Sequence, residues 1–178
     1  MGQRLRWFMV SLVGRDRPGI VAGVTQALYA GGCTLGETSM MRLGGNFSIM
    51  MMAACPVASA EGLVALLRPQ VESLGLHLHV DPIEARLHEH PQPDVRITVY
   101  GADRPGIVAQ VTTALAAAGF NILDLESDVG GTTEAPIYVL HMEGQALEGV
   151  APLRSALEAL RREAGVEVSL SPVEAMIG

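Results

Sequence analysis

The sequence contains no lysine, and this absence excludes several kinds of active site. Its twelve basic residues are all arginines in a chain of 178 residues. Enzymes that form a Schiff base need a lysine amine, and the phosphate-binding P-loop needs a lysine beside the phosphates. Neither site can be built within this chain. Nucleophile elbows, zincin helices and dinucleotide fingerprints are absent from the sequence as well, so catalysis is not expected.

Positive charge is scarce overall and is unevenly distributed. The formal net charge is −7. Residues 1–88 hold seven arginines and six acids, whereas residues 89–178 hold five arginines and thirteen acids. Proteins that bind nucleic acids usually present a basic patch or stripe to the phosphates. We therefore expect no direct contact with nucleic acid.

Long hydrophobic runs are missing, although hydrophobic residues make up 49% of the chain. The apolar run near the N-terminus, Trp7 to Val13, is about seven residues long and does not resemble a signal peptide. A membrane-spanning helix needs about 20 apolar residues. The sequence predicts a soluble, cytoplasmic protein that makes no use of a membrane.

Cysteine is also rare. Cys33 and Cys55 are the two cysteines, and the second half of the chain has no matching pair. Small domains that depend on disulfides carry a denser pattern of cysteines. We therefore expect no disulfide framework and a reducing compartment. No histidine or basic residue neighbours Cys33 in sequence, so it is interpreted as a buried, inert thiol rather than a nucleophile.

Aromatic residues form only 4% of the chain, so aliphatic residues and methionine must fill the interior. Five methionines lie close together in the sequence: Met40, Met41, Met50, Met51 and Met52. Methionine is flexible and fills irregular gaps. We interpret these residues as filling within or between domains, with a surface for a partner as the alternative.

One stretch occurs twice. Residues 16–22 read Asp-Arg-Pro-Gly-Ile-Val-Ala, and residues 103–109 repeat them letter for letter, 87 positions later. Identity of this length at constant offset indicates a duplicated module. Each copy follows a short apolar run and precedes apolar residues at helical spacing. The repeated stretch is therefore predicted to form a turn from a strand into a helix.

The residues of this turn are of the types that begin a helix and that can bind an anion. Proline has a backbone torsion compatible with the first helical turn, and the preceding aspartate can accept a hydrogen bond from a first-turn amide. Glycine leaves the backbone amides open to a ligand, and amides at a helix N-terminus bind carboxylates well. The alternative is that the stretch is only a good helix start that both copies inherited.

The remaining pattern predicts the same order of elements twice: strand, helix, strand, strand, helix, strand. In the first half, Gly44-Gly45 separates two strands at 34–42 and 46–55, which is a hairpin signal. Pro69 lies within the second helical stripe and is expected to kink or break that helix. Two such units predict an α+β fold of two ferredoxin-like domains, each with a four-stranded antiparallel sheet and its helices on one face. The expected boundaries are domain 1 at 1–87, a polar, proline-bearing linker at 88–94 and domain 2 at 95–178.

This βαββαβ module resembles the ACT domain, a small regulatory module that senses amino acids. The residues that carry the resemblance are Gly-x-Asp-Arg-Pro-Gly-Ile-Val at 14–21 and 101–108, together with Gly-Phe-Asn-Ile at 119–122. The first copy departs from the pattern, because Thr34 stands where the second has Asn121. Two such modules in tandem are similar to the glycine cleavage system transcriptional repressor family.

The resemblance implies a ligand site between paired modules, where the turn of one meets the second strand of its neighbour. Turn amides would take a carboxylate, and Asp or Asn side chains would take the ammonium or the carboxylate. The second module is expected to bind better, because asparagine reaches further than threonine and offers an extra acceptor. The residues nominated in this way are Asp103, Pro105, Gly106, Ile107 and Asn121, followed by Asp16, Pro18, Gly19, Ile20 and Thr34.

The function that the resemblance implies is non-catalytic: amino-acid sensing that regulates transcription of glycine cleavage or related metabolism through a protein partner. The alternative is a free-standing allosteric regulatory subunit of a metabolic enzyme, and an enzyme on this fold is a weaker third hypothesis. Glycine is the first choice of ligand. No cofactor and no metal are expected. The chain is expected to form a homodimer, because closed twofold dimers are the commonest oligomers.

Two further groups of polar residues have ordinary interpretations. His77 and His79 alternate on a predicted strand, and His88 and His90 follow, but no cysteine or carboxylate cluster completes a metal site. A solvated strand face and linker is the preferred interpretation. Acidic residues alternate along another strand, where they would discourage pairing between sheet edges or dock a basic partner: Asp124, Glu126 and Asp128.

Overall fold

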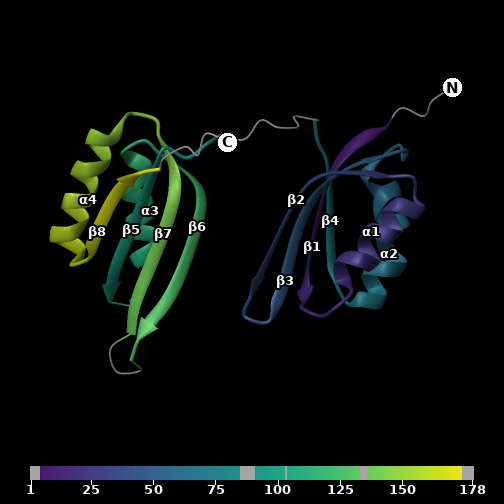
Figure 1. The fold of residues 1–178 in the computed structure, drawn as a ribbon, viewed down its shortest axis with the longest axis horizontal. Helices are drawn as coiled ribbons and strands as arrows, with labels where there is room; N and C mark the ends of the chain where they lie inside the picture. The colour runs from purple at the N-terminus through teal and green to yellow at the C-terminus, as the bar shows by residue number, and fades with distance from the viewer. Residues whose placement is uncertain (1–4, 85–90, 103, 133–135, 174–178) are drawn as a thin grey trace. The chain divides into compact units, whose positions relative to one another are not determined.

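The computed structural model describes residues 5–84, 91–102, 104–132 and 136–173. The chain divides into two compact units, residues 1–89 and 90–178, which we call the first and second modules. In each, two helices cover one face of a sheet (Figure 1). Within the described ranges, no helix is long and apolar enough to cross a membrane.

The two modules have the same element order and the same topology. In the first, the sheet order is β2-β3-β1-β4, and in the second it is β6-β7-β5-β8. All strand pairs are antiparallel. This is the predicted α+β ferredoxin-like fold. The elements of the first module are β1 (Arg6–Arg15), α1 (Ile20–Ala30), β2 (Thr34–Leu43), β3 (Asn46–Cys55), α2 (Ala60–Leu74) and β4 (His77–Pro82). Those of the second are β5 (Val95–Ala102), α3 (Ile107–Ala117), β6 (Phe120–Gly131), β7 (Pro136–Ala146), α4 (Val150–Ala164) and β8 (Glu167–Pro172).

Each core forms because period-2 strands and helical stripes bury the same face of the sheet. On β1, alternate residues are buried, namely Phe8, Val10 and Leu12. The helices cover them with residues four apart: Ile20, Val24 and Leu28 from α1, and Leu63, Leu67 and Val71 from α2. The second module repeats this with Val95, Ile97 and Val99 on β5 under α3 and α4.

The second strand of each module bulges at the same place. The irregularity lies between Leu35 and Thr38 in β2 and between Ile122 and Asp124 in β6. Leu35 pairs with Ala53, and Ile122 pairs with Gly144. An extra residue in one strand bends it and increases its twist. The duplication therefore preserves the shape of the strand on which Thr34 and Asn121 were nominated.

Gly19, rather than Asp16, caps α1. It lies in the left-handed region with φ 89°, and no side chain caps the helix. Gly106 does the same for α3 with φ 85°. The expectation that the aspartate caps the helix is wrong in the first module, because a left-handed residue intervenes and Asp16 instead pairs with Arg42. The turn requires glycine at this position because φ is positive there, a conformation that residues with a side chain rarely adopt.

Pro69 does not break α2, which runs without interruption from Ala60 to Leu74. The buried stripe of Leu63, Leu67 and Val71 crosses the proline and packs both halves of the helix against the sheet. Packing therefore outweighs the lost backbone hydrogen bond that proline imposes. The break that the sequence allowed for is therefore wrong, and the kink stays a prediction.

Cys33 and Cys55 form a disulfide, which corrects the expectation of free thiols. Cys33 precedes β2 and Cys55 ends β3, and the pairing of Thr34 with Ala54 brings the two together, with 4.2 Å between their Cα atoms. The bond closes a separation of 22 residues. With the thiols paired, the inference of a reducing compartment loses its basis.

The methionines divide between core and surface. Met51 and Met52 are buried, whereas Met40, Met41 and Met50 are at least half exposed. Met51 faces the helices, as its strand neighbours Phe47 and Ile49 do. Filling within a domain is therefore confirmed for Met51 and Met52, and filling between domains or a surface for a partner stays a prediction for the other three.

Candidate functional site

The repeated turn of the first module lines a pocket of about 360 Å³. The turn follows β1, and Asp16 is held to the β2–β3 hairpin because its backbone N–H donates to the Gly45 carbonyl at 3.1 Å. The turn residues from Asp16 to Ala22 form one wall, and the other wall consists of Met40, Arg42 and Phe47 from the hairpin. Three nominated residues besides Asp16 therefore line the same pocket: Pro18, Gly19 and Ile20.

The first turn of α1 offers backbone donors to this pocket. The helix has no acidic residue in its first turn and no side-chain cap. The first N–H groups of a helix have no intrahelical acceptor, and the helix dipole adds partial positive charge there. Ile20, Val21 and Ala22 all line the pocket. A carboxylate is the group that suits such a position.

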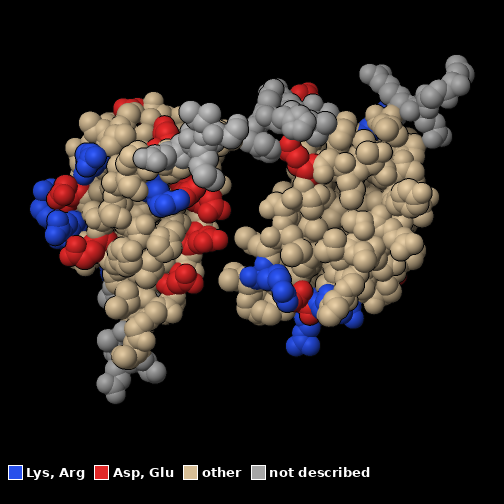
Figure 2. Space-filling model, viewed as in Figure 1, with Lys and Arg blue, Asp and Glu red and all other residues tan. Residues whose placement is uncertain are grey.

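An ion pair lies in the pocket. The Arg42 guanidinium donates from Nη2 to Oδ2 of Asp16. The Asp16 side chain is 21% exposed and the Arg42 side chain 67%. Figure 2 shows basic side chains gathered at this end of the first module. Sequence reasoning missed Arg42, because β2 is not adjacent to β1 in the sheet and no motif marks the position.

The turn of the second module is described except for Asp103, which lies outside the described residues. Pro105 and Gly106 are exposed, and Ile107 is buried. Arg104 donates from Nη2 to Oε1 of Gln110 at 3.0 Å. The register places Val129 where the first module has Arg42. Each pairs with an aromatic residue, Tyr138 or Phe47, and that residue pairs with the glycine one position before the end of β5 or β1.

Thr34 and Asn121 lie away from the turn of their own module. Thr34 is the first residue of β2 and Asn121 the second of β6, and each strand follows a helix of 11 residues, whereas the turn precedes that helix. A helix of this length spans about 16 Å. Both side chains are exposed, and Asn121 donates from Nδ2 to Oε1 of Gln145 at 3.4 Å. A single module therefore does not bring either residue to its own turn pocket.

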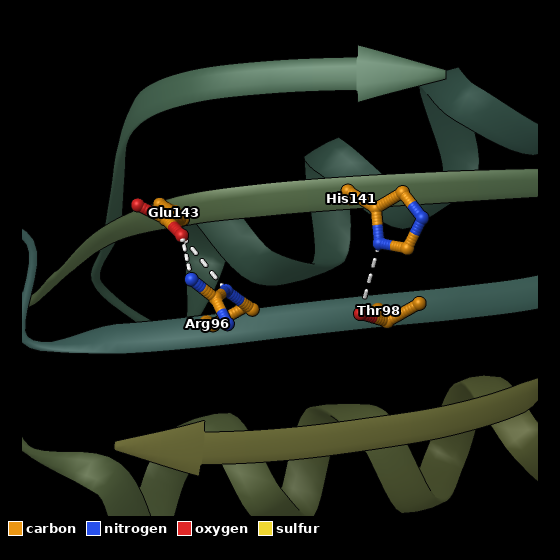
Figure 3. A network of polar contacts seen from close by, with 4 residues as sticks. All are labelled: Arg96, Thr98, His141 and Glu143. Atoms are coloured by element: carbon orange, nitrogen blue, oxygen red, sulfur yellow. Dashed lines mark hydrogen bonds and ion pairs between the residues drawn. The ribbon is translucent and has the colours of Figure 1, made fainter. Parts of the chain in front are cut away.

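The open face of the second sheet carries a polar network that sequence reasoning did not find (Figure 3). Arg96 donates from Nε to Oε1 of Glu143 at 2.7 Å, and Thr98 Oγ1 lies 3.2 Å from His141 Nδ1. Arg96 pairs with Glu143 and Thr98 with His141 across β5 and β7. Cross-strand pairs of this kind stabilise a sheet. We assign the network to the sheet, since its members satisfy one another.

The other polar groups singled out from sequence are surface features. His77 and His79 are exposed, and His79 pairs with Asp81 at 2.9 Å, as expected of a solvated strand face. His88 and His90 lie outside the described residues. Among the described residues, no cluster of three potential ligands could hold a metal ion. Asp124, Glu126 and Asp128 are exposed along β6, an edge strand, where Figure 2 shows a row of acidic side chains.

The structure lowers the pKa of the Glu61 carboxyl. The causes are a hydrogen bond with the Ser59 side chain and a second with the backbone amide of Glu61 itself. Ser59 is the N-cap of α2 and accepts from the Gly62 N–H at 3.3 Å. This cap follows the end of β3, at the opposite end of the sheet from the turn pocket. We therefore assign the contact between Ser59 and Glu61 to the capping of α2.

Comparison with known proteins agrees with this architecture. The first module matches the ACT domain family over residues 6–81, and the second matches it over residues 95–165. The glycine cleavage system transcriptional repressor of Escherichia coli (strain K12) is 23% identical over 175 residues, which cover 94% of this chain and 90% of that protein. Phosphoserine phosphatase SerB2 of Mycobacterium tuberculosis is 25% identical over 169 residues, which cover 91% of this chain and 40% of that longer protein.

A solved structure also has this fold over its full length. It is an unknown protein from Galdieria sulphuraria, with a TM-score of 0.77 and 23% sequence identity, covering 96% of this chain and 99% of that one. At this identity the likeness shows the fold. The family matches, the duplicated turn and the two identical sheet orders lead to one conclusion: this chain belongs to the ACT domain family and consists of two ACT domains in tandem.

Proposed function

We propose that this protein senses a small amino acid and regulates transcription of glycine cleavage, or of related amino-acid metabolism, through a protein partner in the cytoplasm. The observation that carries the proposal is the turn pocket of the first module, where helix N-terminal amides, a carboxylate and a guanidinium surround a space the size of a small ligand. A zwitterion is complementary to these groups. The relative of similar length, a transcriptional repressor, supports the biological role.

A second candidate is regulation of a metabolic enzyme. It is favoured by the match to SerB2, where a region similar to this whole chain forms part of a longer protein that is named a phosphatase. Affinity capture from lysate of the native organism, with and without amino acid, separates the two functions. Recovery of a transcription factor supports the first, and recovery of a biosynthetic enzyme supports the second. Catalytic turnover of a small acid by the purified chain would contradict both.

Amino-acid binding is the direct test. Calorimetry of the full chain against the twenty amino acids should find a ligand, and glycine is the first choice because of the related repressor. Failure of every amino acid to bind would overturn the proposed function. Light scattering on the same samples tests the expected homodimer. A monomer that binds with full affinity would contradict sites completed by a second copy.

Asn121→Ala should weaken binding at least tenfold. We propose that Asn121, at the start of β6, binds the ligand beside the turn of a neighbouring module. Losing one hydrogen bond to a charged group costs about 1.5–3 kcal/mol, which is roughly tenfold to more than a hundredfold in affinity. Thr34→Ala is the matched variant in the first module and should have a milder effect. If Thr34→Ala is the more damaging change, the second module is not the better binder.

A further inference from the structure

The second strands beside the two turns differ chemically, although the turn itself is identical in sequence. In the first module, the position on the second strand that pairs with Phe47 is Arg42, and in the second module the position that pairs with Tyr138 is Val129. Two pairs back along the strand, Met40 in the first module corresponds to Ser127 in the second. The second strand of the first module therefore has a cation and a long apolar side chain where that of the second module has an aliphatic side chain and a hydroxyl.

The Arg42–Asp16 ion pair supplies one positive and one negative charge, which are complementary to the carboxylate and the ammonium of an amino acid. Asp16 is the only acid among the residues that line the pocket, and it is mostly buried. Arg42 uses Nη2 for the ion pair and is largely exposed, so further guanidinium donors remain for a second acceptor. Arginine binds carboxylates in a bidentate manner. A bound zwitterion would give its carboxylate to Arg42 and its ammonium to Asp16, so each charge of the ion pair would keep a partner of opposite sign. Arg17 also lines the pocket and adds a second positive charge.

Apart from Arg17, the remaining walls are largely apolar. Met40, Phe47, Ile20 and Val21 line the same space. A volume of about 360 Å³ is at the small end of the range for ligand pockets, about 300–1,000 Å³, and it leaves room beyond the two charged groups of an amino acid. Glycine has no side chain to contact these walls. An aliphatic side chain of the ligand would bury its own apolar surface and that of the pocket walls.

We propose that Arg42 determines specificity in the first module and that this pocket takes an aliphatic amino acid such as leucine, whereas the second module takes a different ligand. This inference rests on the proposed function and adds a ligand class to it. It assigns to Arg42 the carboxylate, to Asp16 the ammonium and to Met40 and Phe47 the side chain. The chain would then respond to two amino acids instead of one.

The test is calorimetry of the full chain with L-leucine and with glycine, on wild type, Arg42→Val and Asp16→Asn. Arg42→Val copies the residue of the second module, and valine suits an exposed strand position. We expect either substitution to weaken leucine binding at least tenfold. Fluorescence melting of Trp7, the one tryptophan, shows whether each variant keeps the first module folded.

The outcomes separate this inference from the proposed function. If the wild type binds no amino acid, both fail. If it binds glycine or another amino acid but not leucine, or if Arg42→Val binds leucine as tightly as wild type does, the specificity role of Arg42 is overturned and the proposed function stands. Val129→Arg is the reciprocal variant, and a gain of a second leucine site in it would support the assignment further.

Discussion

Loss of the Cys33–Cys55 disulfide is expected to lower the free energy of unfolding of the first module by about 3 kcal/mol. The bond joins residues 22 apart, and closing a loop of that length removes about this much conformational freedom from the unfolded chain. For a domain of this size the melting temperature should fall by roughly 12–24 °C.

The measurement compares oxidised wild type, wild type with reductant, and the Cys33→Ala, Cys55→Ala double variant. Emission of Trp7, which lies on β1, reports the first module alone, and circular dichroism reports both modules. Alkylation before and after reduction, followed by mass spectrometry, establishes that the bond is present at the start. The second module contains no cysteine, so its transition is the internal control. Equal melting of Trp7 emission with and without reductant would contradict the prediction.

Gly144→Ala should destabilise the second module by about 3 kcal/mol or more, because a Cβ atom there has no space. An added methyl group would overlap the backbone carbonyl oxygen of Asn121 and would lie 2.8 and 2.9 Å from two ring carbons of Phe120. These neighbours cannot withdraw easily, since Phe120 is buried in the core and Asn121 is paired in the sheet. The substitution should also displace Asn121 and weaken ligand binding.

Gly130→Ala is the matched control on the neighbouring strand of the same sheet. Nothing lies within 4 Å of a Cβ added to Gly130, and its backbone torsion does not demand glycine. Thermal melting by circular dichroism should separate the two variants, while Trp7 emission stays unchanged in both. If Gly144→Ala melts together with Gly130→Ala, the close approach of Asn121 to Gly144 is wrong.

These two predictions concern equivalent regions of the two modules, at the start of the second strand, which we call the corner. Where the first module has Cys33 and Ala53, the second has Phe120 and Gly144 at equivalent positions beside the bulge. A disulfide secures the corner in one case, and an aromatic ring over a glycine fills it in the other. The residue at each of these positions can be explained only together with its partner, because the two side chains together must fill the same space.

Local patterns in the sequence determined the two modules, the order of their elements, the buried faces of β1 and of the helices, and the repeated turn. Alternation such as Phe8, Val10 and Leu12, and helical spacing such as Ile20, Val24 and Leu28, depend on neighbours within a few residues. The exact repetition of the turn predicted its position in both copies. These features could be predicted because a short segment contains all the information that produces them.

Tertiary structure alone decided the Arg42–Asp16 pair, the Cys33–Cys55 bond and the contact of Asn121 with Gly144. Each joins residues more than 20 positions apart, and each depends on the register between two strands. A shift of one residue would turn every side chain of a strand to the other face of the sheet. The register results from packing of the whole sheet against its helices, and no single stretch of sequence contains it.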